Sequence, residues 1–299
     1  KEQSFYDVNG KRCLTNEGYA IIREQYDLRG ALFESSFYGI DGALSSPNGG
    51  HARIVVQFDS CGNPIEQLLY DVYGNYTHIK CKYDSRGNQI EESYYDMKGN
   101  LCNSIMGYAR VINKYDSRGN QIGQSFIGEN DSLTYTSAGY ATVVSKFDEF
   151  DNVIEQRFYD TNGNLCLNNK NFAMMRAQHD LHGRIIELSY YGLDGLLCNS
   201  NENFARMVIK YDMRGNVKEE SVYGINGHSC ISIHGYSKIV YDYDSLDNRI
   251  CEEYYGPDER ICVDNNGITR KIYKYTSKNK LYMIFGYDQN GNEVNSERI

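Results

Sequence analysis

Apolar and polar residues alternate along many short segments of this chain, and turn-forming residues separate the segments. Residues 19–26 read YAIIREQY, in which Ala20, Ile22 and Tyr26 share one parity and are small, aliphatic and aromatic. Alternation with a period of two is typical of a β-strand that buries one face. We therefore predict strands here and at the matching positions downstream, such as Ala109, Val111, Tyr115 and Ala205, Met207, Tyr211.

The segments that follow each turn carry two apolar columns of their own. One comprises Phe33, Ile65, Ile90, Ile122, Ile154, Ile186 and Ile250. The other comprises Phe37, Leu69, Tyr94, Phe126, Phe158 and Tyr190. A four-residue D-x-x-G loop would place both columns on the face of the Ala20 positions. The opposite face then carries Lys82, Lys114, Lys146, Lys210, Glu34, Glu66, Glu91, Glu155, Glu187 and Glu219. The pattern therefore predicts amphipathic antiparallel hairpins.

The D-x-x-G motifs are expected to be tight turns. Asp suits the first position of a type I turn, and Gly suits the left-handed residue that closes a short hairpin loop. In three turns another residue replaces this glycine, namely Asp151, Asp247 or Asn279. Asp and Asn tolerate a positive φ better than most residues with a side chain, so these exceptions agree with the prediction.

One repeat extends through the whole chain. The aromatic residue of its KYD motif recurs at Tyr26, Phe58, Tyr83, Tyr115, Phe147, His179, Tyr211, Tyr243 and Tyr275. The steps between these positions are 32, 25, 32, 32, 32, 32, 32 and 32 residues. A second aromatic residue follows 12 residues after the first, as Tyr38 follows Tyr26, and Ile127 is the one exception. Tyr6 stands at this second position in a unit whose front is missing. A sustained period of this size indicates a repeat architecture rather than two globular domains.

The single step of 25 residues shows what each unit contains. Between Tyr70 and Tyr83 the chain lacks the L-C-x-N-x-x-G piece that other units have. One turn at residues 71–74 must then return the second strand directly to the next first strand. We therefore predict two main strands in each unit. The L-C-x-N-x-x-G piece forms a small lobe in the units that have it.

These patterns predict an all-β fold of tandem antiparallel β-hairpin repeats. We expect one repeat array over residues 1–299, with about nine units of 32 residues, one of them shortened to 25 at 58–83. About eighteen strands at a spacing of ~4.8 Å form a long ribbon, and open sheets of more than ~10 strands usually curl or split. The sheet should thus be elongated and curled or spiral, with its apolar face lining an interior.

Composition and charge narrow the classes of partner. The net charge is −9 with a pI near 5.2, which disfavours binding to nucleic acid or to an anionic membrane surface. No stretch approaches 18 consecutive apolar residues, so we predict no membrane span and a soluble chain. The N-terminus lacks an initiator Met and an apolar signal core, so we expect a fragment of a longer protein whose compartment is unknown.

The motif GYARVINKYDSRGNQIEESYYD, assembled from neighbouring repeats, resembles tandem repeats of uncharacterised bacterial proteins over nearly the whole chain. It is more distantly similar to MORN repeats and to the YD repeats of toxin-encapsulating proteins, both built from stacked β-hairpins. The absence of Trp departs from MORN-like units, which are rich in Gly-Trp or Glu-Trp. The resemblance implies hairpin repeats and no catalytic residue within them.

Cysteines fall in one column of the lobe: Cys13, Cys102, Cys166, Cys198, Cys230 and Cys262, with Ser45, Thr134 and Val294 as substitutes. A small buried position accommodates all of these residues. Ser, Thr and Val do not supply the Cys, His or carboxylate ligands that a zinc site needs. We favour the core interpretation. Disulfide cross-links between neighbouring lobes remain the alternative in an oxidising compartment.

Other polar motifs have a structural interpretation that we favour over a chemical one. His51 and His179 stand in aromatic columns, and a zinc site from His228, Cys230 and His234 is the minor alternative. The motifs at 160–164 and 288–292 resemble the start of a calcium loop but lack its downstream Glu, which favours turns. The Glu column recurs in most units, unlike an active site, so we expect a solvated face rather than paired catalytic carboxylates.

A column of tyrosines gives the candidate binding residues, on the polar face near the strand ends: Tyr38, Tyr70, Tyr95, Tyr159, Tyr191, Tyr223 and Tyr255. Each ring is either covered by the lobe of its own unit or exposed in a row that stacks sugars or grips a peptide. The sequence leaves both alternatives open.

The resulting functional hypothesis is a non-enzymatic binding or scaffolding module without a cofactor or metal. Protein–protein interaction along an extended surface comes first, because repeat arrays commonly provide one. Glycan or cell-wall binding through the tyrosines is the alternative. An enzyme would need a site in the irregular units, at 71–82, 123–135 or 257–283, and the oligomeric state is not predicted.

Overall fold

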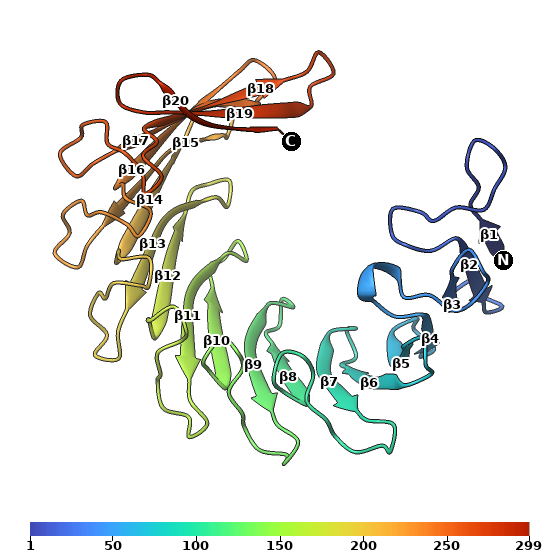
Figure 1. Ribbon diagram of the computed structural model, residues 1–299. Helices are drawn as coiled ribbons and strands as arrows, with labels where there is room; N and C mark the ends of the chain where they lie inside the picture. The colour runs from blue at the N-terminus through green and yellow to red at the C-terminus, as the bar shows by residue number, and fades with distance from the viewer. Residues whose placement is uncertain (299) are drawn as a thin grey trace. The chain divides into compact units, whose positions relative to one another are not determined.

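The computed structural model describes residues 1–298 and consists almost entirely of antiparallel β-strands (Figure 1). This confirms the predicted all-β class and the tandem hairpins. The chain divides into two compact units, Lys1–Ser137 and Ala138–Ile299. A single array over residues 1–299 therefore stays a prediction.

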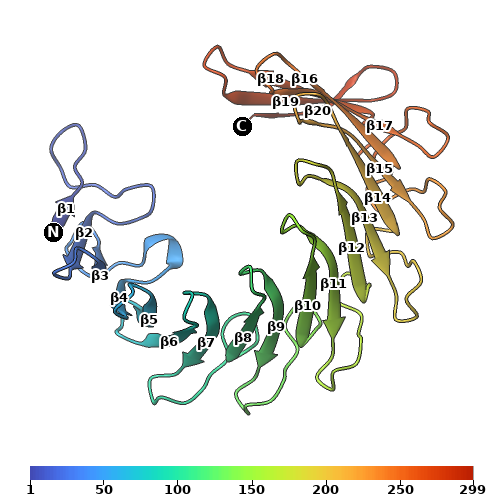
Figure 2. The same cartoon turned by 180° about the vertical axis from the view of Figure 1, so that it is seen from behind.

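In the first unit the strands follow one another in chain order, each paired with the strand before it (Figure 2). They are β1 (Glu2–Ser4), β2 (Ile21–Tyr26), β3 (Leu32–Tyr38), β4 (Arg53–Phe58), β5 (Pro64–Tyr70), β6 (Tyr76–Tyr83), β7 (Gln89–Tyr95), β8 (Arg110–Tyr115) and β9 (Gln121–Ile127), with the 3₁₀ turn η1 (Pro47–Gly49) between β3 and β4.

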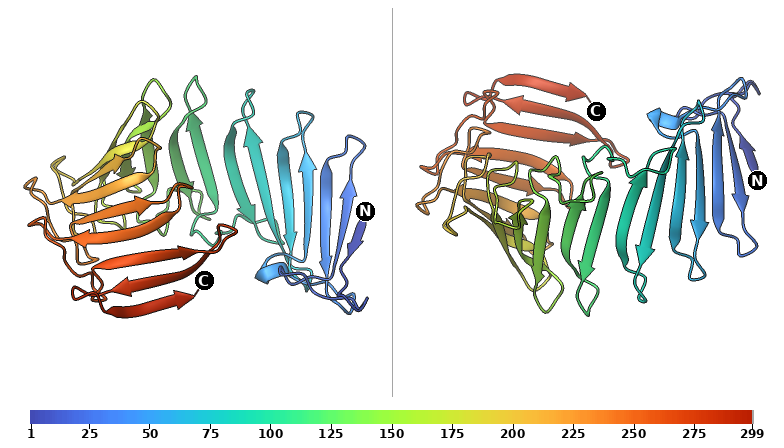
Figure 3. Two further views of the ribbon diagram at one scale, coloured as in Figure 1. Left: turned by 90° about the horizontal axis from the view of Figure 1, so that it is seen from above. Right: turned by 90° about the horizontal axis from the view of Figure 1, so that it is seen from below.

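The second unit repeats the same succession (Figure 3). Its strands are β10 (Thr142–Phe147), β11 (Val153–Tyr159), β12 (Met174–His179), β13 (Ile185–Tyr191), β14 (Arg206–Tyr211), β15 (Val217–Tyr223), β16 (Lys238–Tyr243), β17 (Arg249–Tyr255), β18 (Arg270–Tyr275), β19 (Leu281–Tyr287) and β20 (Glu293–Arg298). Within residues 1–298, neither unit pairs its own first strand with its own last strand, so neither closes into a barrel.

The turns have the predicted chemistry. In the first full hairpin the amide of Gly30 donates to the carbonyl of Asp27, and Gly30 has a φ of +85°. The Asp27 carboxylate also accepts hydrogen bonds from the amides of Arg29 and Ala31. Where the glycine is replaced, Asp151, Asp247 and Asn279 have φ values of 66°, 63° and 61°. The local sequence therefore determines each hairpin turn.

The strand register defines two faces of each sheet. Opposite residues of an antiparallel pair lie on the same face. Tyr38 lies opposite Ile21, which defines the tyrosine face, and Phe37 lies opposite Ile22, which defines the ladder face. The predicted grouping of the Ile22 and Phe37 columns is confirmed.

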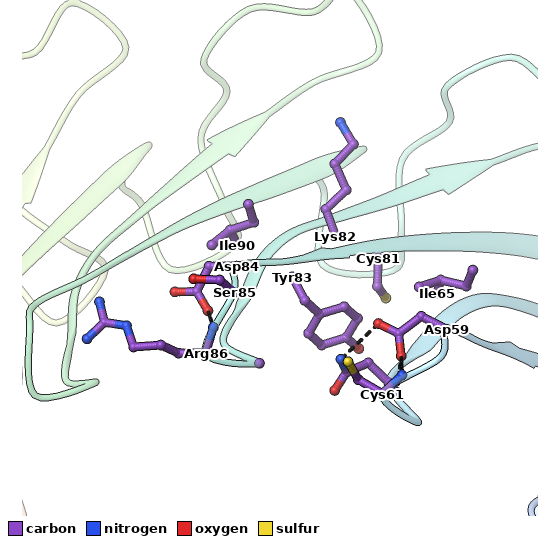
Figure 4. Close-up of a pocket in the computed structure, with 12 residues that line it drawn as sticks. Asp59, Cys61, Ile65, Cys81, Lys82, Tyr83, Asp84, Ser85, Arg86 and Ile90 are labelled. Atoms are coloured by element: carbon purple, nitrogen blue, oxygen red, sulfur yellow. Dashed lines mark hydrogen bonds between the residues drawn. The ribbon is translucent and has the colours of Figure 1, made fainter.

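The predicted position of the Phe33–Ile250 column is wrong, because each hairpin contains a β-bulge. In β6–β7, Glu91 lies opposite Lys82 but Gln89 lies opposite Tyr83, so Ile90 is an extra residue. A bulge interrupts the alternation of side chains. Figure 4 shows Ile90 on the side to which Lys82 points, whereas Cys81 and Tyr83 point to the other side.

The same column is also less buried than a core position. Ile65, Ile154 and Ile250 are 37%, 36% and 37% exposed. The core of each unit lies instead at the lobe end of the ladder face, where the alanines of the Ala20 column are fully buried: Ala20, Ala52, Ala109, Ala141, Ala173 and Ala205.

Aromatic rings form the main part of this core. In the second unit a lobe residue, Phe172, packs between Phe158 and Tyr190 of the adjacent second strands, with ring centroids 5.8 and 4.5 Å apart. Tyr140 and Phe204 extend the row at its two ends. We call this row of rings, contributed alternately by lobes and second strands, the aromatic ladder. In the first unit it comprises Phe5, Tyr19 and Phe37, and then Tyr94, Tyr108 and Phe126.

The shortened unit folds as predicted. β5 returns to β6 through the turn at residues 71–74, with Tyr70 opposite Tyr76 and no lobe between them. The lobe is therefore an excursion between hairpins and not an obligatory third strand.

Candidate functional site: the tyrosine face

The seven predicted binding residues all lie at the last position of a second strand, on the tyrosine face. They are Tyr38, Tyr70, Tyr95, Tyr159, Tyr191, Tyr223 and Tyr255, which end β3, β5, β7, β11, β13, β15 and β17. Each side chain is half-buried. The register places them beside the first residues of the partner strands, as Arg53 lies opposite Tyr70 and Arg206 opposite Tyr223.

A cation covers the ring of six of these tyrosines, at 4.5–5.5 Å from the ring centroid. The pairs are Arg23 on Tyr38, Arg53 on Tyr70, Lys80 on Tyr95, Arg176 on Tyr191, Arg206 on Tyr223 and Lys238 on Tyr255. A cation at this distance from an aromatic face is attracted by the ring. Neither sequence alternative foresaw a basic residue as the covering group.

Each cation also contacts a carboxylate, in most cases from the preceding hairpin. Arg53 donates two hydrogen bonds, of 3.0 and 2.9 Å, to Glu34 on β3. The hydrogen bonds to Glu34 raise the pKa of Arg53. The same arrangement joins Arg176 to Glu155 at 2.9 Å and Arg206 to Glu187 at 3.2 Å. The repeated element of the face is thus a carboxylate, a cation and a tyrosine ring that together span two hairpins.

Tyr159 differs from the other six. The residues of β10 on its face include Thr142 opposite its backbone and Val144 two positions on, neither of which is basic. Among the residues that the structure describes, no cation lies over the Tyr159 ring. Within residues 1–298 the Tyr159 ring therefore lacks the arginine or lysine that lies over each of the other six rings.

The Lys and Glu columns share the tyrosine face, as predicted. Lys82 pairs with Glu91 at 3.0 Å and Lys210 with Glu219 at 2.8 Å. The Glu155 side chain is only 8% exposed and contacts Lys146, Arg157 and Arg176. Burial opposes ionisation of Glu155, but hydrogen bonds from Lys146 and Arg176 outweigh it and lower its pKa.

The sequence contained a signal for the covering cations. The first strand begins with a basic residue after a small one in AR at 52–53 and 205–206 and in SK at 237–238, which accounts for three of the six cations, whereas Arg23, Lys80 and Arg176 stand further along their strands. Its position opposite the tyrosine follows only from the register, which the bulge and turn geometry set together. Sequence reasoning therefore found the rings and missed their partners.

The cysteine column has a structural role in the lobes. Cys166, Cys198 and Cys230 each direct Sγ at a backbone carbonyl of the preceding lobe, at 3.8, 3.7 and 3.5 Å. Ser45 makes the equivalent bond to Gly18 at 3.2 Å. A position that needs a small, weak donor explains why Cys and Ser alternate there. All nine cysteines are free thiols in this structure.

The turn carboxylates are occupied by their own backbone. Asp160 accepts hydrogen bonds of 2.8 Å from the amides of Asn162 and Asn164, and Asp288 does the same for Asn290 and Asn292. The side-chain amide of Asn292 also donates to Asp288, and hydrogen bonds of these two kinds lower the pKa of both carboxyl groups. Across residues 1–298, no group of three or more His, Cys, Asp or Glu residues is placed to hold a metal ion.

Several cavities lie on these sheets. One of them, of about 760 Å³, is an open hollow between two turns and is lined by Asp59, Cys81, Tyr83 and Arg86 among others (Figure 4). The carboxylates of Asp59 and Asp84 accept hydrogen bonds from backbone amides of their own turns. Burial raises the pKa of Cys81 to about 11. These groups therefore have a structural use.

A cavity of about 220 Å³ lies in the second unit beside Val222. Burial raises the pKa of Glu220, which lines it together with Glu202 and His234. In the described part of the chain no hydrogen bond joins these three side chains. A further cavity, of about 380 Å³, lies in the first unit.

Comparisons with known proteins are distant. A scan of protein-family models and a search of curated proteins give no match. A crystal structure of TcdB2-TccC3-TEV matches 89% of this chain and 15% of that chain, at 14% identity and a TM-score of 0.34. One of TcdB2-TccC3 matches 95% and 17%, at 14% identity and a TM-score of 0.29. A porin-like protein from Bacteroides uniformis matches 88% of both chains, at 8% identity and a TM-score of 0.27.

This chain spans less than a fifth of the TcdB2-TccC3 chains that it matches. At these TM-scores the matches carry no functional argument, and the fold rests on the strand pairing of the chain itself. Residues 1–298 contain no helix long and apolar enough to cross a membrane. The tandem hairpins implied by the resemblance to YD repeats are confirmed, whereas membership of a bacterial, MORN or YD repeat family stays a prediction.

Proposed function

We propose that this chain is a non-enzymatic scaffold module that binds a protein partner along the tyrosine face. The observation that supports the proposal is the repetition of one surface element. Seven hairpins, including the one that ends at Tyr287, present the same group, a half-buried tyrosine ring under a basic side chain. Tyr and Arg are also the residue types that most often dominate the energy of protein interfaces.

The spacing of these elements suits an extended protein segment. Two strands at ~4.8 Å place successive tyrosines of one unit roughly 10 Å apart. A polyproline II segment rises ~3.1 Å per residue with three residues per turn, so every third side chain of such a partner faces an equivalent group. The basic groups remain accessible, since the side chains of Arg53 and Arg176 are 41% and 49% exposed. Each guanidinium has five N–H donors, and contacts with one glutamate leave some of them for a partner.

A peptide library displayed on phage tests the proposal. Peptides selected on the immobilised chain should bind the double variant Tyr191→Ala/Tyr223→Ala at least tenfold more weakly. They should bind Leu181→Ala, an exposed turn-tip variant, as they bind the unchanged chain. A library that yields no peptide sensitive to the double variant would overturn the proposal.

Glycan recognition is the second candidate, and Tyr159 is the observation that favours it. A ring without a covering cation is available to stack on a sugar. A glycan-array hit that disappears in both Tyr159→Ala and Tyr191→Ala would favour glycan binding over a protein partner. A hit that survives both substitutions would exclude the tyrosine face as the glycan site.

A further inference from the structure

The shortened unit leaves a gap in the aromatic ladder of the first unit. In most complete units the residue before the buried small residue is a lobe aromatic whose ring enters the ladder, as Tyr108 does between Tyr94 and Phe126, whereas His51 and Ile268 stand there in two others. In the shortened unit this residue is Tyr76, which lies opposite Tyr70 on the tyrosine face, with ring centroids 5.2 Å apart. Thr77 takes the ladder face opposite Leu69 and supplies no ring.

A cavity of about 380 Å³ occupies this gap. It is lined by His51, Leu69, Thr77, Ile79 and Tyr94 and by the next lobe, residues 102–106. In the second unit the equivalent space between Phe158 and Tyr190 is filled by Phe172, which is 4% exposed. The fold therefore contains the two walls of a ring-binding slot without the ring.

The backbone of the neighbouring lobes is also incomplete at the gap. Successive lobes are joined by one amide-to-carbonyl bond, such as Asn48 to Glu17 at 2.9 Å and Asn201 to Lys170 at 2.9 Å. By the same register, the amide of Ile105 and the carbonyl of Gly49 would bond to the missing lobe. In the described part of the chain neither group has a backbone partner, and Ile105 is fully exposed.

We propose that this gap binds an aromatic side chain carried on a loop of a partner protein, which takes the place of the missing lobe. The ring would enter between Leu69 and Tyr94, and the loop backbone would bond to Ile105 and Gly49. The inference rests on the proposed function only in that the partner is a protein.

Two features favour a loop over other occupants. A free aromatic molecule would fill the slot but leave the Ile105 amide and the Gly49 carbonyl without partners. The lobes of a second copy are engaged in their own ladders, so one of them would have to leave its repeat to enter the slot. Burial of one aromatic side chain removes enough apolar surface from water for a weak but specific contact.

The probe is a capped peptide with the sequence of residues 164–173, Asn-Leu-Cys-Leu-Asn-Asn-Lys-Asn-Phe-Ala, in which Cys166→Ser prevents oxidation. Calorimetric titration should show binding to the chain, at least tenfold weaker for the peptide with Phe172→Ala. Filling the slot with Thr77→Phe should reduce peptide affinity at least tenfold. Met213→Phe, at a fully exposed turn tip, should leave it unchanged.

Folding and alternative occupants are tested in the same experiment. Far-UV circular dichroism and thermal unfolding establish that Thr77→Phe is folded. Ile79→Ala removes an apolar wall of the slot and should also weaken peptide binding. Equal binding of the Phe172→Ala peptide, no effect of Thr77→Phe, or binding of N-acetyl-phenylalaninamide as tight as that of the peptide would overturn the proposal. So would a concentration-dependent dimer in sedimentation that Thr77→Phe abolishes. Tyr191→Ala/Tyr223→Ala should bind the peptide normally, so this proposal and the proposed function fail separately.

Discussion

The phenol of Tyr211 on β14 donates a hydrogen bond of 2.9 Å to the backbone carbonyl of Ile185, at the start of β13 in the preceding hairpin. These strands pair only from Glu187 to Ser189, whereas the strands within the hairpin β14–β15 pair from Arg206 to Tyr211. Neighbouring hairpins thus separate toward their turns, and the tyrosine bridges the space. The same bond recurs from Tyr83 to Pro64, Tyr115 to Gln89, Tyr243 to Val217 and Tyr275 to Arg249.

Tyr211→Phe should lower the free energy of unfolding by about 1 kcal/mol, the usual net worth of one internal hydrogen bond. A ring without the hydroxyl is accommodated at this position, since Phe58 and Phe147 occupy it in other repeats. Urea unfolding followed by circular dichroism measures the change. Tyr26→Phe is the matched control, because within residues 1–298 the Tyr26 hydroxyl bonds only to the side chain of Glu24 on its own strand. This substitution should change the free energy of unfolding little. Equal losses in both variants would contradict an inter-hairpin role.

Val222→Phe should stabilise the second unit. Val222 occupies a ladder position that holds Phe126 or Phe158 in other repeats, and it borders the cavity of about 220 Å³. Burial of a larger apolar side chain in existing space contributes roughly 1 kcal/mol. Differential scanning calorimetry should therefore show a higher Tm. Val143→Phe, at a buried valine that lines none of the cavities described, should lower Tm through overpacking.

Glu155→Gln should lower the free energy of unfolding by about 1–2 kcal/mol, because a nearly buried carboxylate loses its charge-assisted bonds to Lys146 and Arg176. The pKa of Glu155 is lowered in the folded chain, so its contribution is complete above the ordinary value of 4.5 and is lost as the pH falls below it. Urea unfolding from pH 7 to pH 3 should show the difference between the two proteins shrinking with acidity. Glu293→Gln, on an exposed part of β20, serves as the control. A difference that grows toward pH 3 would contradict this account.

Thiol reactivity should follow burial. Cys61 is exposed at a turn tip, whereas burial raises the pKa of Cys81 to about 11 and so depletes its thiolate. At pH 8 a disulfide reagent should react with one thiol of the native chain well before the others, and Cys61→Ser should remove that fast phase. Five cysteines of the lobe column should react slowly, since burial also raises their pKa: Cys102, Cys166, Cys198, Cys230 and Cys262. Unfolding in urea should make all nine thiols react at similar rates. Rapid labelling of Cys81 in the native chain would contradict its buried position.

The sequence alone determined the features that depend on a few adjacent residues. Asp27 and Gly30 specify one turn without help from the rest of the chain, because a carboxylate caps the loop amides and a glycine accepts the positive φ. Alternation around Ile22 and Phe37 specifies strands and their shared face. The missing lobe near Tyr70 correctly predicted a direct return of the chain at residues 71–74.

Tertiary structure decided what depends on register between strands. The bulge at Ile90 adds one residue to one strand, and since side chains alternate with a period of two, one residue is enough to break the predicted face. The same registers bring Arg53 between Glu34 and Tyr70, three residues that are far apart in the chain. A local pattern could show a row of tyrosines, but only pairing across hairpins could place a cation over each of six rings and leave Tyr159 without one.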